Sequence, residues 1–440
     1  MGGAITIAGI AGDSDETVTI SADDAIADGD VGDSTTETVS LGNVGDSDST
    51  EIHNLTVTAD EGITLTGAIY TSASAVVGSE AADIVFNDKV LVNGTVIIDS
   101  NDSANDGVIT FSTSIDGVDG TDDDLTINSG TGTLTLQAIG ATQALSTLNI
   151  NTAATSTANI SLPNIGDAGN DGVDGATNIG NSLTNQLTIS GTIYKTGGAT
   201  DYEAKSGNTI LLTGVSPTIT TGGAGLSFST GNLVLSSAGT TTFTTGSGSA
   251  GGITVAGTID GTNGQNEALA LESGSGAIQL QGTIGGTNPV TTLAINSTNG
   301  SAGTIEIVGI GDSDTTGASS TATIGNTSTG TLTLDGTIYK TGGNQTYVAS
   351  ATGNDSGQNI DITGAATFTT TNDAVAFNTS GVDLANNGTT TINTGTGIGA
   401  VSFAGALESD GGNNDLLVIT SGEGDVTFTG AVGATNALGG

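Results

Sequence analysis

The chain has 440 residues, with 72 Gly, 8 Phe, 5 Tyr, no Trp and no Cys, and its 46 acidic residues against four Lys give a net charge of −42. Such a chain must build its core from Ile, Leu, Val and Ala, and no disulfide can cross-link it. Its negative charge cannot neutralise phosphates, so nucleic acids and anionic membrane surfaces are not expected partners. No run of about 18 apolar residues exists, so no membrane insertion is expected.

The chain opens with Ile5-Thr-Ile-Ala-Gly-Ile-Ala-Gly-Asp13, an alternating segment that returns at Ile160 and at Ile305. The first copy is followed by an acidic stretch that the later copies lack. We therefore predict an insertion at about residues 13–52, which we expect to protrude, because insertions in repeat proteins map to loops on one face. Parts of this stretch still alternate apolar and polar residues, which predicts an added pair of strands.

Two further motifs recur in the same order. The segment 187–198 is repeated almost unchanged at 332–343, 145 residues further on, and a divergent copy covers 63–70. A longer motif at 125–145 has relatives at 269–290 and 417–438. Self-similarity at a fixed period indicates a repeat architecture. We predict three repeats, at 1–155, 156–300 and 301–440, within one continuous solenoid.

Within each repeat, apolar residues alternate with Thr or Ser over three to five positions, and Gly, Ser, Asn and Thr form the turns. No segment has the period and caps of a helix. Strands this short and this poor in aromatic residues favour a β-solenoid over a β-sandwich, and Gly and Asn supply the positive φ angles that sharp corners need. The sequence therefore predicts an all-β, elongated parallel β-helix.

The two ends of the chain fall at related points of the repeat. The chain begins at the first strand of one copy and stops just short of the next. This arrangement is typical of a piece of a longer array, and it equally suits subunits that stack end to end. A solenoid exposes unpaired strand edges at both ends unless they are capped or paired.

The motif Ser-Gly-x-Gly-x-(Leu/Val)-Thr-(Leu/Phe), followed by (Ile/Val)-Gly-Ala-Thr, occurs within 125–145 and again within 417–438. It resembles the large bacterial β-strand-repeat surface proteins, which are similar to filamentous-haemagglutinin-type adhesins. The resemblance implies a right-handed parallel β-helix, export to the cell surface and a structural or adhesive role. The sequence shows no secretion domain of that family.

Two acidic clusters have carboxylates at the spacing of turns, as oxygen-coordinated cations require. Their candidate calcium ligands are Asp116, Asp119, Asp122, Asp123, Asp124, Asp171 and Asp174. Neither the EF-hand order nor the calcium-binding nonapeptide of β-rolls is present. The alternative is that these residues form solvated acidic corners. We expect no required cofactor, with calcium as the one candidate.

Catalysis is not expected. Pectate-lyase-like β-helix enzymes use an Arg base, and this chain contains no Arg. His53 is the one histidine, so neither a Ser-His-Asp triad nor a metal site built from several histidines is expected. A glycosidase needs two carboxylates that face each other across a cleft, whereas the acids here lie mostly in Gly-rich turns and not on strand faces.

Two tyrosine–lysine pairs, Tyr194 with Lys195 and Tyr339 with Lys340, recur in the second motif. They are candidate interface residues, either as stacking surfaces for sugars or as contacts between neighbouring molecules. The alternative is that the tyrosines cover one corner of the core. Because Lys is rare here, the lysines are expected to lie among acids.

These observations predict a non-enzymatic, extracellular structural protein that forms a rigid rod or filament segment at the cell surface. Its expected partner is itself, through end-to-end or lateral contacts. The alternative is an adhesin module that binds surface glycans, or host or neighbouring cells.

Overall fold

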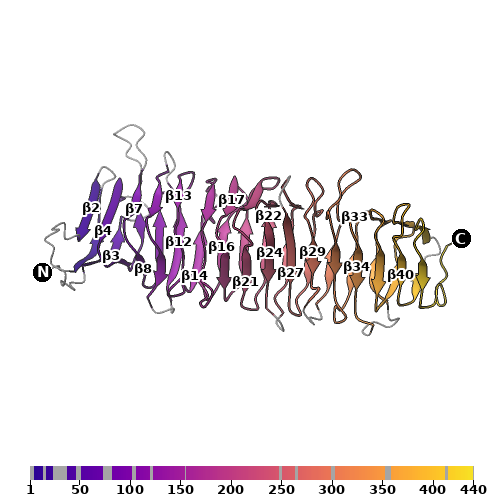
Figure 1. Ribbon diagram of the computed structural model, residues 1–440. Coiled ribbons are helices and arrows are strands. Elements are labelled where there is room, and N and C mark those ends of the chain that lie inside the picture. The colour runs from indigo at the N-terminus through magenta and orange to yellow at the C-terminus, as the bar shows by residue number, and fades with distance from the viewer. Residues whose placement is uncertain are drawn as a thin grey trace, which may run out of the picture. The chain divides into compact units, whose positions relative to one another are not determined.

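The computed structural model describes residues 4–12, 16–22, 37–45, 51–72, 82–101, 106–118, 122–153, 155–246, 250–262, 266–298, 303–351, 358–411 and 415–439. These residues form parallel β-strands and turns and contain no helix (Figure 1). The predicted all-β solenoid of stacked parallel strands is therefore confirmed, while its handedness and the three sequence repeats remain predictions. The chain divides into two compact units, Met1–Ile210 and Leu211–Gly440. The boundary falls within β20 (Thr209–Leu212).

In the first unit, each coil contributes strands to three parallel sheets. One sheet contains β2 (Thr17–Ala22), β4 (Asn54–Ala59), β7 (Ile84–Phe86), β10 (Ile109–Phe111), β13 (Leu134–Thr135), β15 (Ile160–Leu162) and β17 (Gln186–Ile189). The second contains β1 (Ile5–Ile10), β3 (Thr38–Val44), β5 (Gly62–Leu65), β8 (Val90–Val92) and β11 (Ile115–Gly117), and continues through Ile139 and Ile165 to β18 (Ile193–Thr196). The third contains β6 (Ile69–Tyr70), β9 (Val96–Asp99), β12 (Asp124–Asn128), β14 (Thr147–Ile150), β16 (Thr177–Gly180) and β19 (Thr200–Glu203).

The second unit repeats this plan. One sheet contains β23 (Asn232–Leu235) and β26 (Ile259–Asp260), continues through Ile284 and Ile310, and adds β33 (Ile338–Lys340), β36 (Thr367–Thr369), β39 (Thr389–Asn393) and β42 (Leu416–Thr420). The next contains β21 (Thr218–Thr221), β24 (Gly239–Thr244), β27 (Glu267–Glu272), β29 (Leu293–Ile295), β31 (Ala322–Ile324), β34 (Gln345–Val348), β37 (Val375–Asn378), β40 (Val401–Phe403) and β43 (Val426–Phe428). The third contains β22 (Leu226–Thr230), β25 (Ile253–Val255), β28 (Ile278–Leu280), β30 (Ile305–Ile307), β32 (Leu332–Leu334), β35 (Gln358–Ile362), β38 (Gly381–Leu384) and β41 (Leu407–Ser409).

The core of each unit follows from the alternation of apolar and polar residues. Successive side chains of a strand point to opposite faces, so every second residue points into the coil. Because the strands are parallel and in register, inward residues stack on like residues of the next coil. Ile63, Val90 and Ile115 form one such fully buried column. Phe86 and Phe111 stack in another, with their ring centroids 5.2 Å apart.

Glycine forms sharp corners at equivalent places of the repeated motif. Gly140, Gly285 and Gly433 have φ angles of 64°, 66° and 60°. An L-residue rarely adopts this left-handed conformation, whereas glycine adopts it at little cost. This observation confirms the conformational role predicted for glycine at the corners.

The acidic insertion contributes strands to the stack. Its described parts include β2 and β3, which pair with β4 and β5. In these parts the insertion therefore extends the sheets instead of projecting from them. Residues 13–15, 23–36 and 46–50 of the insertion lie outside the described residues.

Candidate functional site

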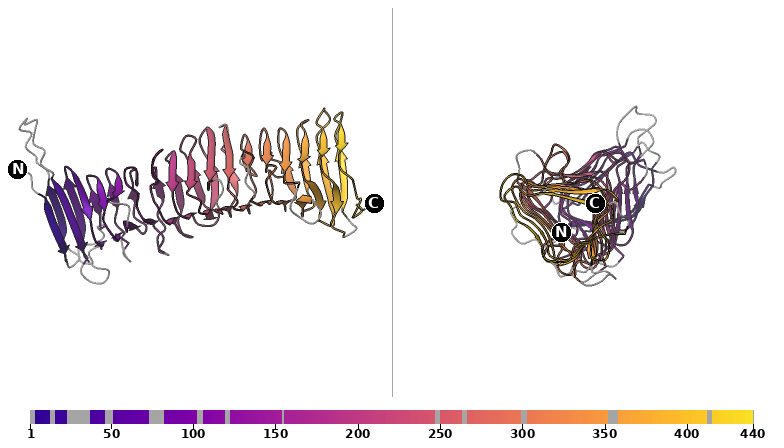
Figure 2. Two further views of the ribbon diagram at one scale, coloured as in Figure 1. Left: turned by 90° about the horizontal axis from the view of Figure 1, so that it is seen from below. Right: turned by 90° about the vertical axis from the view of Figure 1, so that its right-hand side faces the viewer.

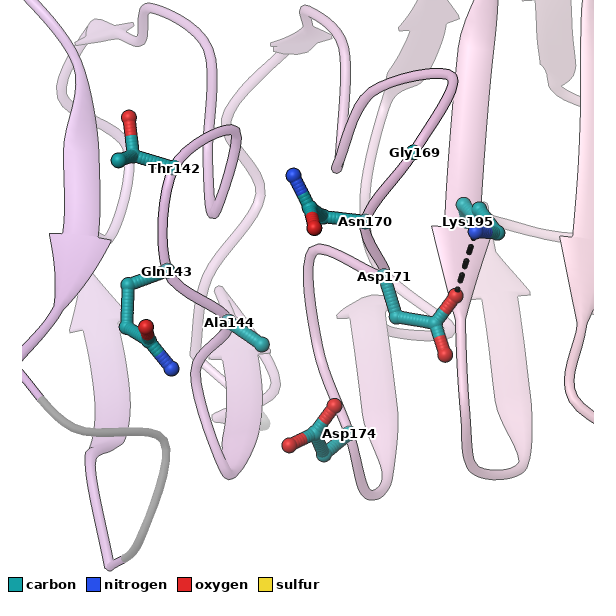
Figure 3. A pocket seen from close by; sticks show the side chains of 8 residues that line it. All are labelled: Thr142, Gln143, Ala144, Gly169, Asn170, Asp171, Asp174 and Lys195. Atoms are coloured by element: carbon teal, nitrogen blue, oxygen red, sulfur yellow. Dashed lines mark ion pairs between the residues drawn. The ribbon is translucent and has the colours of Figure 1, made fainter.

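A polar groove with a volume of about 290 Å³ lies on the first unit (Figure 3). Three successive coils line it, because Ile139, Ile165 and Tyr194 are in register and the loops beside them follow one another. We call this surface the lysine groove. It is lined by Thr142, Gln143, Ala144, Gly169, Asn170, Asp171, Asp174 and Lys195.

One ion pair and one ordered turn shape the lysine groove. Lys195 Nζ lies 3.2 Å from Asp171 Oδ1, as Figure 3 shows. Next to it, Asp167 Oδ1 accepts hydrogen bonds from the backbone amides of Asn170 and Gly169, each at 2.7 Å. These two hydrogen bonds lower the pKa of Asp167. An ionised aspartate therefore holds the loop that carries Asn170 and Asp171.

The lysine groove offers an ammonium group, two side-chain amides, a hydroxyl and two carboxylates. Such a set can hydrogen-bond a polar ligand with several hydroxyl groups. Within the described ranges, no three His, Cys, Asp or Glu side chains are grouped as metal ligands. Calcium binding by Asp171 and Asp174 therefore stays a prediction.

The equivalent corner of the second unit surrounds Lys340. Counting from Ile165 and Ile310, Thr316 and Ser319 stand where the first unit has Asp171 and Asp174. Lacking an acid at that place, Lys340 Nζ donates to the backbone carbonyl of Ser313 at 3.0 Å. The turn itself is retained, because Asp312 Oδ1 accepts from the amides of residues 314 and 315.

Asp116, a candidate calcium ligand, is fully buried and holds the protein's own backbone. Its Oδ1 accepts from the amides of Thr142 at 2.8 Å and Gln143 at 3.3 Å, in the loop of the next coil. Its Oδ2 lies 3.3 Å from Lys89 Nζ and accepts from the Ser114 hydroxyl at 3.2 Å. Asp116 is thus a cap for the neighbouring loop in this structure.

The other candidate ligands are used in different ways. Asp123 is buried and accepts from the amides of Gly94 at 3.2 Å and Val118 at 2.9 Å. Asp124 accepts from the Thr147 hydroxyl at 2.7 Å, and Asp122 is an exposed residue with a φ angle of 60°. Asp119 lies outside the described residues. The structure therefore places Asp116 and Asp123 around one corner, with Asp171 and Asp174 in a following coil.

The same loop cap recurs at two acids that the sequence analysis missed. Asp260 Oδ1 accepts from the amides of Thr287 at 2.8 Å and Asn288 at 3.2 Å. Glu408 accepts from the amides of residues 434, 435 and 436 at 3.2, 3.0 and 2.9 Å. The signal was an acid directly after an inward Ile or Leu, 26–28 residues before the loop that it caps.

The two candidate interface tyrosines are core residues. Tyr194 and Tyr339 are fully buried, and each hydroxyl donates to a backbone carbonyl, that of Leu162 at 2.8 Å and that of Ile307 at 2.9 Å. Burial raises the pKa of both phenols. Of the predicted interface residues, only Lys195 and Lys340 reach the surface.

The last coil of the second unit exposes side chains that are buried in earlier coils. Its inward positions on β43 and just after it are occupied by apolar residues that are 39–46% exposed, namely Val426, Phe428 and Val432. Leu416 and Val418 are exposed as well, but they lie on the outer face of β42, in register with Thr389 and Thr391. Among the described residues, β42 pairs only with β39, and β43 pairs only with β40. The right-hand view of Figure 2 looks onto this coil, in yellow. We call the three inward residues Val426, Phe428 and Val432 the C-terminal face.

The described residues contain no helix that could cross a membrane. Comparison of the chain with protein-family models, with curated proteins and with solved structures gave no match.

Proposed function

We propose that this protein is a non-enzymatic, extracellular structural protein, a rod or filament segment of the cell surface, whose copies associate end to end. The C-terminal face is the observation that carries the proposal. It combines three half-exposed apolar side chains with the edges of β42 and β43 that no described strand covers. Fully covering one Val, Leu or Phe side chain contributes about 1.5–3 kcal/mol, and an unpaired edge accepts a further strand.

The chemistry of the acids supports a structural role over a catalytic one. The buried carboxylates of Asp116, Asp260 and Glu408 accept backbone amides of the next coil, so they stabilise the stack. The proposed extracellular location rests on the resemblance to bacterial surface proteins. The charge of −42 keeps separate copies of the chain dispersed by self-repulsion until specific contacts form.

Negative-stain electron microscopy with and without millimolar calcium tests the proposal. We expect filaments in the wild type and single particles in Phe428→Asp, because a charge on the C-terminal face prevents its burial. Ile398→Asp is the matched control, since Ile398 is 78% exposed outside this face. Single particles of the wild type under both conditions would overturn the structural proposal. Filaments that form only with calcium would support the structural proposal and would indicate that the acidic turns bind calcium during assembly.

The lysine groove supports a second candidate function, that of an adhesin module for surface glycans. Its hydroxyl, amide and carboxylate groups suit the hydroxyl groups of a sugar. A glycan microarray would show saccharide binding by the wild type that is lost in Asp174→Ala. Binding should persist in Lys340→Ala, which alters the equivalent corner that lacks the two acids. Absence of wild-type binding, or equal loss in both variants, would reject this function.

A further inference from the structure

The strands equivalent to β43 show what covers its open side. The longer sequence motif occurs at 125–145, 269–290 and 417–438, and its three copies contain β13, β28 and β43 at the same place. In the first unit β13 is covered by β15, and in the second unit β28 is covered by β30. Both covering strands begin the next copy of the Ile-x-(Ile/Leu) motif, at Ile160 and at Ile305. The site next to β43 is therefore shaped for a strand of this motif.

The chain carries one more copy of this motif, in β1. Ile5-Thr-Ile7 corresponds to Ile160-Ser-Leu162 and to Ile305-Glu-Ile307. Among the described residues, β1 pairs only with β3, so no described strand covers its second edge. Its inward residues are half-buried, whereas those of β15 and β30 are fully buried.

We propose that β1 of a second copy of the chain adds in parallel to β43. This inference deepens the proposed function and rests on it. The register follows from the covered strand β28, where Ile278 pairs with Ile305, Gln279 with Glu306 and Leu280 with Ile307. By the same register, Val426 pairs with Ile5 of the second copy, Thr427 with Thr6, and Phe428 with Ile7.

The residues that follow extend the junction around the corner of the coil. Ile139 bridges to Ile165, and Ile284 bridges to Ile310. Ile165 and Ile310 lie five residues after Ile160 and Ile305, the first residues of the covering strands. The equivalent residues at the junction are Val432 and Ile10. Both are part of half-exposed apolar surface, and pairing them would bury the 46% of Val432 that is now exposed.

This contact is heterologous, because one copy contributes its last strand and the other its first. Such contacts form open chains, so the register predicts filaments in preference to closed dimers. Because both partners are acidic, the association should strengthen with ionic strength, as salt screens the charges beyond roughly 10 Å at 0.1 M.

Cysteine cross-linking tests the register, because the chain has no cysteine of its own. Thr6 and Thr427 are both exposed and would lie side by side at the junction. The variants Thr6→Cys and Thr427→Cys are mixed and oxidised with diamide. In-register residues of neighbouring strands are close enough for a disulfide, which spans about 4.4–6.8 Å between Cα atoms.

Two pairs serve as controls in the same assay. Thr6→Cys is mixed with Asp425→Cys, which is displaced by two residues along the strand. It is also mixed with Gln279→Cys, the equivalent position of β28 that β30 already covers. We expect the Thr6/Thr427 pair to give at least ten times more cross-linked dimer than either control.

The outcomes separate the register from the proposed function. Filaments in the microscope with equal cross-linking in all three pairs would overturn the register and leave end-to-end assembly standing. Single particles without cross-linking would overturn both. Selective cross-linking of the Thr6/Thr427 pair, strengthened at higher salt, would support both.

Discussion

The strands β28 and β43 have the same pattern of residues and opposite environments. Ile278 and Leu280 of β28 are at most 1% exposed, whereas Val426 and Phe428 of β43 are 43% and 39% exposed. Each strand pairs with a strand of the coil before it, and of the two only β28 also pairs with a described strand of a following coil. A coil therefore cannot complete its own core, because much of the burial of its inward side chains comes from the next coil.

The largest effect should separate two phenylalanines of one stack. The rings of Phe403 and Phe428 are stacked with their centroids 5.1 Å apart, and the ring of Phe403 is also stacked on that of Phe377, with their centroids 4.9 Å apart. We expect Phe403→Ala to lower the free energy of unfolding by about 3–5 kcal/mol, because it leaves a cavity. Phe428→Ala should cost about 1 kcal/mol or less in dilute solution. Urea unfolding followed by circular dichroism measures both, and equal losses would contradict the account.

The next effect concerns the acids that cap the loops. Asp260→Ala should lower the free energy of unfolding by about 1–3 kcal/mol, because two backbone amides lose a charged acceptor. Asp174→Ala is the control, with an exposed carboxylate and an expected change within about 0.5 kcal/mol. The same unfolding assay compares them, and a large loss in the control alone would show that the buried caps do not stabilise the stack.

A smaller effect should depend on pH. Asp361, Asp383 and Glu408 are neighbours in register on β35, β38 and β41. Desolvation, and then the charges of Asp361, Asp410, Asp415 and Glu408, raise the pKa of Asp383 to about 6. A raised carboxyl pKa means that the folded state binds the proton more tightly, so stability rises as the pH falls through about 6 towards 3.8.

Asp383→Asn tests this sign. At pH 8 the amide should stabilise the second unit by about 1 kcal/mol, after allowing for the screening of a half-exposed group. Near pH 4.5 the gain should largely disappear, since Asp383 of the wild type is then mostly protonated. Thermal unfolding at the two pH values measures the gain, and equal stabilisation at both would show that charge is not its cause.

The smallest effect should come from the lysines. Lys195 pairs with Asp171 on the surface, and Lys340 donates to a backbone carbonyl. An exposed ion pair contributes about 0–1 kcal/mol and is screened by salt. We expect Lys195→Ala to cost about 0.5 kcal/mol at low salt and nothing measurable at 1 M. The salt dependence should be smaller in Lys340→Ala, because Lys340 has no direct ion pair among the described residues and acts on Asp312 only through its charge. An equally large salt-dependent loss of stability in both variants would remove the distinction between the two corners.

The alternation of residues predicted the fold class because strands this short have one apolar and one polar face. It could not predict the role of Asp116, whose partners are in the loop 26–27 residues further on and are fixed only once the coils stack. The sequence also could not decide whether Tyr194 and Tyr339 are interface or core residues, because a tyrosine side chain occurs both at surfaces and in cores. Their burial depends on the strand that covers them.

The most direct test of end-to-end assembly is amide hydrogen exchange in β43 and β28 at several chain concentrations. We predict that protection of residues 426–428 rises with concentration until it approaches that of residues 278–280, which should stay constant. Protection of β43 that is independent of concentration, in a sample with filaments, would contradict the assignment of the C-terminal face as the junction between copies.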